Sequence, residues 1–250
     1  MLLALLLAGM PTFIANGAST VTAGTGTCTP TMPGSIVAND ILILVACGEG
    51  DDEGVGIALT TANGFASVIA EQDGADNDAL EEDPESNCEV FWKRAVGGDS
   101  APVVTDSGDH TTCAVHQFRG TKKTGNPWNA SAGGNDSNAN DTSANIPGAT
   151  TTADNCLVVL IQSTSNNATS TANCGAVTNA NLANITERFD SSNTSGLGGG
   201  HCIITGELAT QGTYATSTLT MGATTFKAAF SIALEGALGG YVRTLMGVGQ

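Results

Sequence analysis

The chain alternates short runs of aliphatic and β-branched residues with long tracts of Gly, Ser, Thr, Asn and Asp. Apolar runs bounded by turn-forming residues are typical of β-strands. No segment has a sustained helical period, apart from a turn or two over 2–7. The pattern predicts six strands at 41–47, 89–95, 111–118, 156–162, 201–208 and 226–234, and weaker strands at 12–14, 67–71, 102–105, 185–189 and 217–221.

Three of these runs predict how a strand is buried. Alternate residues from Phe226 to Leu234 are apolar, which predicts a half-buried antiparallel strand. The run ILILV at 41–45 is apolar on both faces and predicts a central strand covered on each side. In FWKRA, Lys93 and Arg94 are expected to lay their aliphatic stems over apolar surface.

These elements together predict an all-β fold, a jelly-roll-like antiparallel β-sandwich with long polar loops and extended terminal arms. No internal repeat is evident. The connections 48–64, 73–87, 120–155 and 163–183 are long, and loops of such length are usually functional or mobile. We expect an apolar N-terminal arm at 1–10, a sandwich domain at 11–236 and a C-terminal arm at 237–250.

Both ends of the chain carry apolar groups. The N-terminal run imitates a signal peptide, but no basic residue precedes it, and it is too short to span a bilayer. If this run is retained, an apolar surface must bury it, either in the chain's own core or on a neighbouring subunit. The glycine-rich tail is suited to docking on another subunit or to packing back onto its own domain. We predict subunit contacts at Leu2, Leu3, Leu5, Leu6, Leu7, Tyr241, Val242, Leu245 and Met246.

The charge balance narrows the choice of partners. Eight Lys and Arg stand against 24 Asp and Glu, a net charge of −16, so nucleic acid and anionic membranes are not expected partners. Carboxylates concentrated at 51–53 and 73–85 have the chemistry to hold calcium, but they lack the glycine and the spacing of an EF-hand loop. Solvated acidic loops are the favoured interpretation, and no cofactor is expected.

Seven cysteines without CxxC spacing predict neither a zinc ribbon nor a complete disulfide framework, and the odd number leaves at least one unpaired. The cysteines within strand-like runs are expected to act as small buried hydrophobes: Cys47, Cys113, Cys156 and Cys202. The alternative is one or two disulfides that involve the loop cysteines Cys28, Cys88 or Cys174.

The sequence gives little support for a catalytic site. The three histidines, His110, His116 and His201, are dispersed, and His116 on its strand is expected in a core or an interface. Ser107, Asp109 and His110 contain the residue types of a hydrolytic triad, but SGDH is typical of a turn, and no GxSxG elbow is present. We therefore expect a non-enzymatic protein.

Glycan binding is a second class of function to consider. Trp128 and Tyr214 are candidate sugar-stacking residues, although aromatic residues make up only 4% of the chain. A secreted glycan-binding or adhesion module is therefore the alternative to a structural role.

Several ordered segments carry a resemblance to a known family. They are PGSIVAND leading into ILILV at 33–45, FWKRA at 91–95, SGDH with the strand end FRG at 107–120, and TTADNCLVV at 151–159. In this order they resemble a family of tailed-bacteriophage virion proteins of β-sandwich type. The resemblance runs from about residue 11 to residue 236, nearly the entire chain.

The resemblance implies a particle component that is exposed on the virion surface after assembly in the host cytoplasm. Family members look like head decoration or cement proteins, or tail and fibre parts, with partners among the major capsid or tail proteins and copies of the same chain. A host-surface glycan is a further expected ligand. The family supplies no catalytic residues. This chain departs from the family pattern in MLLALLLAGM, in the tail after Gly236 and in the acidic insertion at 73–85.

Overall fold

A computed structural model describes residues 8–22, 24–50, 56–73, 85–105, 108–164, 174–192 and 200–238. Within these ranges the chain forms strands and no helix, which confirms the predicted all-β class. The strands are β1 (Thr12–Asn16), β2 (Thr20–Val21), β3 (Ile41–Gly50), β4 (Leu59–Thr61), β5 (Ala66–Asp73), β6 (Glu85–Arg94), β7 (Val103–Val104), β8 (Gly108–Arg119), β9 (Trp128–Ile146), β10 (Ala149–Thr150), β11 (Cys156–Thr164), β12 (Val177–Thr178), β13 (Ala183–Ser192), β14 (Gly200–Leu208), β15 (Thr213–Tyr214) and β16 (Ser217–Glu235).

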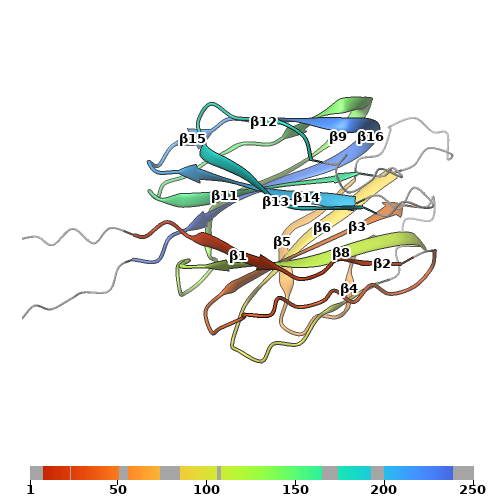
Figure 1. Ribbon diagram of the computed structural model, residues 1–250, viewed down its shortest axis with the longest axis horizontal. Coiled ribbons are helices and arrows are strands. Elements are labelled where there is room, and N and C mark those ends of the chain that lie inside the picture. Colours follow the sequence, from red (N-terminus) through yellow and green to blue (C-terminus); the bar gives the residue numbers. More distant parts are fainter. Residues whose placement is uncertain are drawn as a thin grey trace, which may run out of the picture.

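Two antiparallel sheets pack face to face (Figure 1). The first has the order β1-β8-β3-β6-β5, with β2 beside β8, and the second has the order β9-β16-β11-β14-β13, with β12 beside β16. Each sheet therefore comes from one half of the chain. This confirms the β-sandwich but departs from jelly-roll connectivity, in which strands of the two sheets alternate along the chain.

The two halves repeat one arrangement. When β1, β3, β5, β6 and β8 are matched in order with β9, β11, β13, β14 and β16, both sheets have the same strand order. Because β5 lies against β9 and β1 lies against β13, the halves are related as by a two-fold axis between the sheets. The sequence pattern did not reveal this duplication.

Local geometry follows the same correspondence. The β1–β8 ladder has an irregularity between Phe13 and Ala15, and the β9–β16 ladder has one opposite Ala233 and Leu234. The amide of Thr105, just after β7, donates to the carbonyl of Ala58 at 2.9 Å, and that of Thr220, in β16, donates to the carbonyl of Ala176 at 2.9 Å. The two halves therefore share these backbone pairings although their side chains differ.

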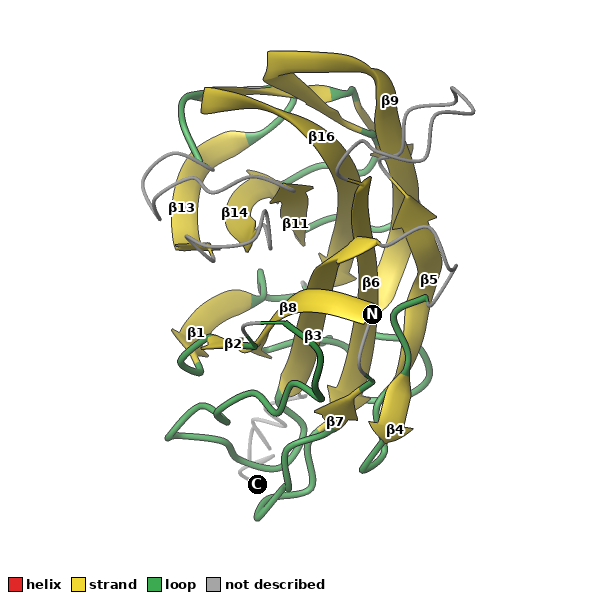
Figure 2. Cartoon of the chain, turned by 90° about the vertical axis from the view of Figure 1, so that its right-hand side faces the viewer, coloured by secondary structure: helices red, strands yellow, loops and turns green. Residues whose placement is uncertain are grey.

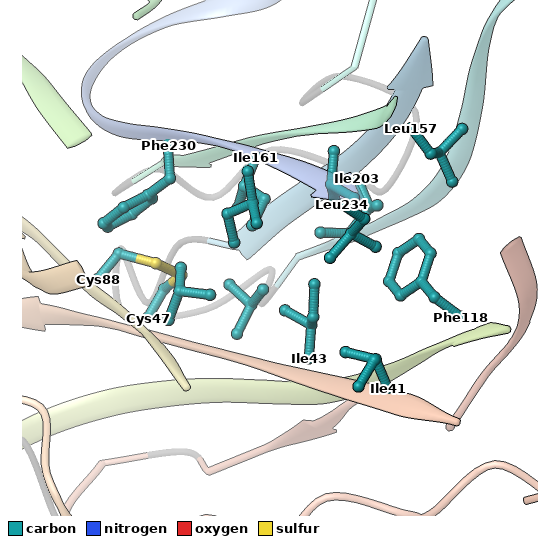
Figure 3. Close-up of a cluster of buried hydrophobic side chains, with 14 of the residues drawn as sticks. Ile41, Ile43, Cys47, Cys88, Phe118, Leu157, Ile161, Ile203, Phe230 and Leu234 are labelled. Carbon is teal, nitrogen blue, oxygen red and sulfur yellow. A yellow bond between two sulfur atoms is a disulfide. The ribbon is translucent and has the colours of Figure 1, made fainter. Parts of the chain in front are cut away.

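The main core lies between the sheets and draws on both halves (Figure 3). Ile41 and Ile43 of β3 and Phe118 of β8 face Leu157 of β11 and Phe230 of β16 across it. A further apolar cluster covers the outer face of each sheet. At about 25 cal/mol per Å² of buried apolar area, these three layers supply the main stabilisation.

Most predicted strands are present, with two corrections. Residues 41–48 are buried on both faces, as predicted. The strand at 226–234 is also buried on both faces rather than half-buried, because an outer cluster that includes Ala229 and Ala233 covers its second side. The predicted loop at 120–155 contains the long strand β9, whose backbone pairs with β16.

The cysteines form three disulfides, Cys28–Cys113, Cys47–Cys88 and Cys174–Cys202, and leave Cys156 as a buried thiol. The expectation of unpaired Cys47, Cys113 and Cys202 was therefore wrong. Each pairs with one of the three loop cysteines named in the alternative, because the fold brings distant segments together. Cys156 is the buried hydrophobe that was predicted.

Among the described residues, no helix has the length and apolar character needed to cross a bilayer.

Candidate functional site

The two described ends of the chain are paired with each other. Ala8 and Leu238 form an antiparallel bridge, and the Gly9 amide donates to the Ala237 carbonyl at 3.2 Å. The Asn155 side-chain amide donates to the Ala8 carbonyl at 3.0 Å. Both ends therefore leave the sandwich side by side, on the left of Figure 1.

The C-terminal segment is also held on its other side. The Ala237 amide donates to the Gly120 carbonyl at 2.7 Å, and the Lys122 amide donates to the Glu235 carbonyl at 2.8 Å. A side chain at Gly236 would overlap the carbonyl oxygen of Gly9, so this close approach requires glycine. The pairing of the two ends is thus built into the backbone.

The residues predicted to make subunit contacts lie at 2–7 and 241–246, outside the described residues. The structure describes only the residues that adjoin these segments, Ala8 and Leu238 among them. Of these, Leu238 is 71% exposed, more than any other large apolar side chain of the described region except Val96.

Aromatic and cationic side chains pack at the end of the sandwich where the paired termini lie. Trp92 and Trp128 meet edge to face with their centroids 5.1 Å apart, and the Arg94 guanidinium lies 6.0 Å over the Trp92 ring. The Arg94 Nη2 donates to the Gly125 carbonyl at 3.1 Å, and burial lowers the pKa of this guanidinium. The Arg94 guanidinium therefore lies over an aromatic ring, and the packing of the Lys93 and Arg94 stems over apolar surface stays a prediction.

Strands β1 and β13 lie at the same side of the sandwich and contact each other (Figure 2). A second polar group lies beside this edge. Nε2 of His116, on β8, is 3.2 Å from Nε2 of His201, on β14. Both histidines are fully buried. Phe189 of β13 stacks on His201 and meets His116 edge to face, with both centroid distances 4.9 Å.

The surrounding bonds determine which ring nitrogens carry protons. The Asn16 side-chain nitrogen donates to the Arg188 carbonyl at 2.7 Å, so its oxygen faces His116 Nδ1 at 2.8 Å and must accept from it. The neutral His116 then offers a lone pair at Nε2, and His201 donates its Nε2–H to that lone pair. Nδ1 of His201 is left as a buried acceptor with no partner in the described structure.

The environment of this pair opposes positive charge. Burial lowers the pKa of His116 well below its usual range, and the neighbouring His201 lowers it further. Burial lowers the pKa of His201 to about 3. The pair is therefore neutral at pH 7, and it has the hydrogen-bonding capacity of a structural link.

Among the described residues, the other candidates do not form one site. Asp109 and His110 begin strand β8 rather than forming the predicted turn, and Ser107 lies outside the described residues. Tyr214 is fully buried and its hydroxyl is 3.1 Å from that of Ser231, so it cannot stack on a sugar. Trp128 packs against the core.

Of the residues considered for calcium, those at 51–53 and 76–83 lie outside the described part of the chain, while Asp73 ends β5 and Glu85 begins β6. Within the described ranges, no three His, Cys, Asp or Glu side chains gather as a metal site.

The fold and its sites define the chain as an antiparallel β-sandwich with a duplicated strand order. Comparison with known proteins returns no match to a family model, a curated protein or a solved structure.

Proposed function

We propose that the protein is a non-enzymatic structural component of a bacteriophage particle, and specifically a capsid decoration or cement protein. The observation that carries the proposal is the bridge between Ala8 and Leu238, which gives both apolar arms one point of departure. The family resemblance supplies the type of particle. The partners are the major capsid protein and further copies of this chain.

Because the two arms continue from one point of the sandwich, they act as a single attachment to a neighbour. Two segments tethered at one point reach neighbouring sites together, so the second contact forms at a high effective concentration. Apolar arm residues buried against a neighbour contribute roughly 25 cal/mol per Å² before the cost of ordering them. Binding of this kind stabilises a shell by linking subunits.

The charge distribution supports an orientation. Strands β3 and β5 end, and β6 begins, at the opposite end of the first sheet from the paired termini. The sequence that follows β3, at 51–55, and the sequence between β5 and β6, at 74–84, are rich in carboxylates, whereas Arg94 and Lys122 lie toward the termini. A molecule attached through its termini would direct the strand ends Gly50, Asp73 and Glu85 outward.

The three disulfides fit this location. Disulfides persist in oxidising surroundings, and a protein on a released particle meets such surroundings. A decoration protein has to remain folded there, and the cross-links limit its unfolding.

Binding to particles that lack the protein tests the proposal. Replacing Leu2, Leu3, Leu5, Leu6, Leu7, Tyr241, Val242, Leu245 and Met246 by serine should weaken binding at least about a hundredfold, because the apolar contacts are lost. The matched control replaces the exposed apolar residues Val21, Val37 and Val96 by serine and should bind as the wild type does. Full occupancy by the arm variant would overturn the docking mechanism.

Electron microscopy with a labelled protein distinguishes the positions on the particle. Label over the head supports the decoration role. Label confined to the tail would replace it with the tail or fibre role, and binding to a glycan array without binding to particles would favour an adhesion module.

A further inference from the structure

We propose that the His116–His201 pair is an acid-sensitive latch that holds the two sheets together along the β1–β13 edge. The proposal does not depend on particle binding. It rests on a chain of hydrogen bonds between the sheets, from the Arg188 carbonyl through Asn16 and His116 to His201.

In this series of hydrogen bonds every donor points toward the Arg188 carbonyl, and the series ends at His201. Each donor in it is matched to an acceptor until Nδ1 of His201, whose lone pair has no partner in the described structure. An added proton can therefore bind at this nitrogen without first breaking a bond. The product is an imidazolium in a fully buried place, where a charge without a counter-ion is costly.

Two charged residues of β13, Arg188 and Asp190, flank Phe189. The Arg188 guanidinium lies 5.3 Å over the Phe13 ring. The Asp190 carboxylate, also on β13, accepts from the Cys174 amide at 3.2 Å and alternates with Phe189 along the strand.

The other described residues placed against the pair are uncharged. In the ladders, Ile43 of β3 lies opposite His116, and Ser163 of β11 lies opposite His201. The β1 residue against the pair is Asn16, and Thr205, farther along β14, accepts from Arg188 Nε at 2.8 Å. Among the described residues, no acidic group contributes to the shift in pKa of either histidine.

The direction of the pH effect follows from linkage. The pKa of both histidines is lower in the folded protein than the usual value of about 6.5, so the open state binds more protons. The latch is therefore intact above about pH 6.5 and weakens as the pH falls below it. Carboxylates titrate mainly below about pH 5, so the histidine effect is separable above that pH.

Hydrogen exchange of the amides of β1 and β13 measures the opening of this edge. Between about pH 7.5 and about pH 5.5, each histidine that stays neutral when closed should raise the opening constant about tenfold, or about a hundredfold for the pair. His201→Gln should reduce the rise to about tenfold, and H116Q/H201Q should abolish it. His110→Gln is the control and should behave as the wild type does.

The proposal is overturned if the opening constant in the wild type rises no more than in the double variant. NMR of the imidazole nitrogens tests the wild type directly, even if a variant fails to fold. The expected spectrum has the proton on Nδ1 of His116 and on Nε2 of His201, with both rings neutral at about pH 5.5. Cationic rings in the folded protein at that pH would also contradict the latch.

Discussion

Asn39 and Asn155 occupy the same place in the two halves of the chain. Both have left-handed backbone conformations, with φ of 71° and 56°. The Asn39 amide donates to the Ala95 carbonyl at 2.9 Å, just after β6, and the Asn155 amide donates to Ala209 at 3.0 Å, just after β14. Each asparagine turns the chain into the central strand of its sheet.

This conformation predicts the effect of substitutions at Asn39. Glycine adopts positive φ freely, so Asn39→Gly should leave the free energy of unfolding nearly unchanged. Asn39→Val should lower it by about 1–2 kcal/mol, because a β-branched residue is strained there. Denaturant titration measures both, and equal stability of the two variants would show that the conformation is not required.

The longest disulfide loop should contribute most to stability. Cys28 and Cys113 are 85 residues apart, against 41 for Cys47 and Cys88 and 28 for Cys174 and Cys202. Loop-closure entropy predicts losses of about 4–5 kcal/mol for the first and about 3.5 kcal/mol for the last on double replacement by serine. Thermal unfolding of the three double variants gives the order, and a reversed order would point to contributions other than chain entropy.

Cys156 should be unreactive in the native protein. Burial and the nearby Glu235 and Asp154 raise the pKa of this thiol to about 11, so little thiolate exists at pH 8. Iodoacetamide without reductant is expected to leave the folded protein unmodified and to add one group after unfolding, as read by mass spectrometry. Rapid labelling of the native chain would contradict this expectation.

Asp40 should stabilise the fold as a buried carboxylate. It accepts from the Val37 amide at 2.9 Å, from Gln117 at 2.6 Å and from the Arg119 guanidinium at 2.7 Å and 2.8 Å. Although burial acts to raise its pKa, the bonds from Arg119, Val37 and Gln117 together lower it. Asp40→Ala should therefore cost about 2–3 kcal/mol at pH 7.

The pH dependence of this cost has a definite sign. Because the folded pKa of Asp40 is lower than the unfolded one, its contribution is complete above the unfolded value and is lost as the pH falls through the folded value. The difference in unfolding free energy between wild type and Asp40→Asn should shrink over this range. A difference that stays constant down to about pH 2 would show that ionisation of Asp40 does not matter.

The paired termini give a test with a matched glycine control. Gly236→Ala would overlap the Gly9 carbonyl oxygen, whereas a side chain at Gly9 would meet nothing within 4 Å. We expect Gly236→Ala to increase exchange of the Gly9 amide about tenfold or more, since losing one hydrogen bond costs about 1.5 kcal/mol. Gly9→Ala should leave the exchange of the Ala237 amide unchanged. Equal protection in both variants would show that the close approach is not needed.

Strand positions followed from the sequence wherever side chains alternate or stay apolar. The runs at 41–47 and 156–162 are strands because they pack between two other layers, and that burial leaves a continuous apolar signature. Strand β9 was missed because its residues, mostly Gly, Ser, Asn and Asp, carry no such pattern. Backbone hydrogen bonds to β16, rather than contacts of its side chains, hold this strand in the sheet.

The geometry of the candidate sites was harder to predict from the sequence. His116 and His201 are separated by 85 residues, and no local pattern relates them, because they meet through the packing of two sheets built from different halves. The disulfide partners and the bridge from Ala8 to Leu238 have the same origin. Each contact depends on where distant strands lie, which local periodicity does not encode.

The sequence by itself determined the all-β class, most of the strands, the net negative charge and the apolar runs at both ends, since these depend on composition and on a period of two residues. Only the tertiary structure decided the duplicated strand order, the cysteine pairing, the histidine pair and the meeting of the termini. These depend on packing two sheets against one core, where contacts form between residues that are distant in the chain.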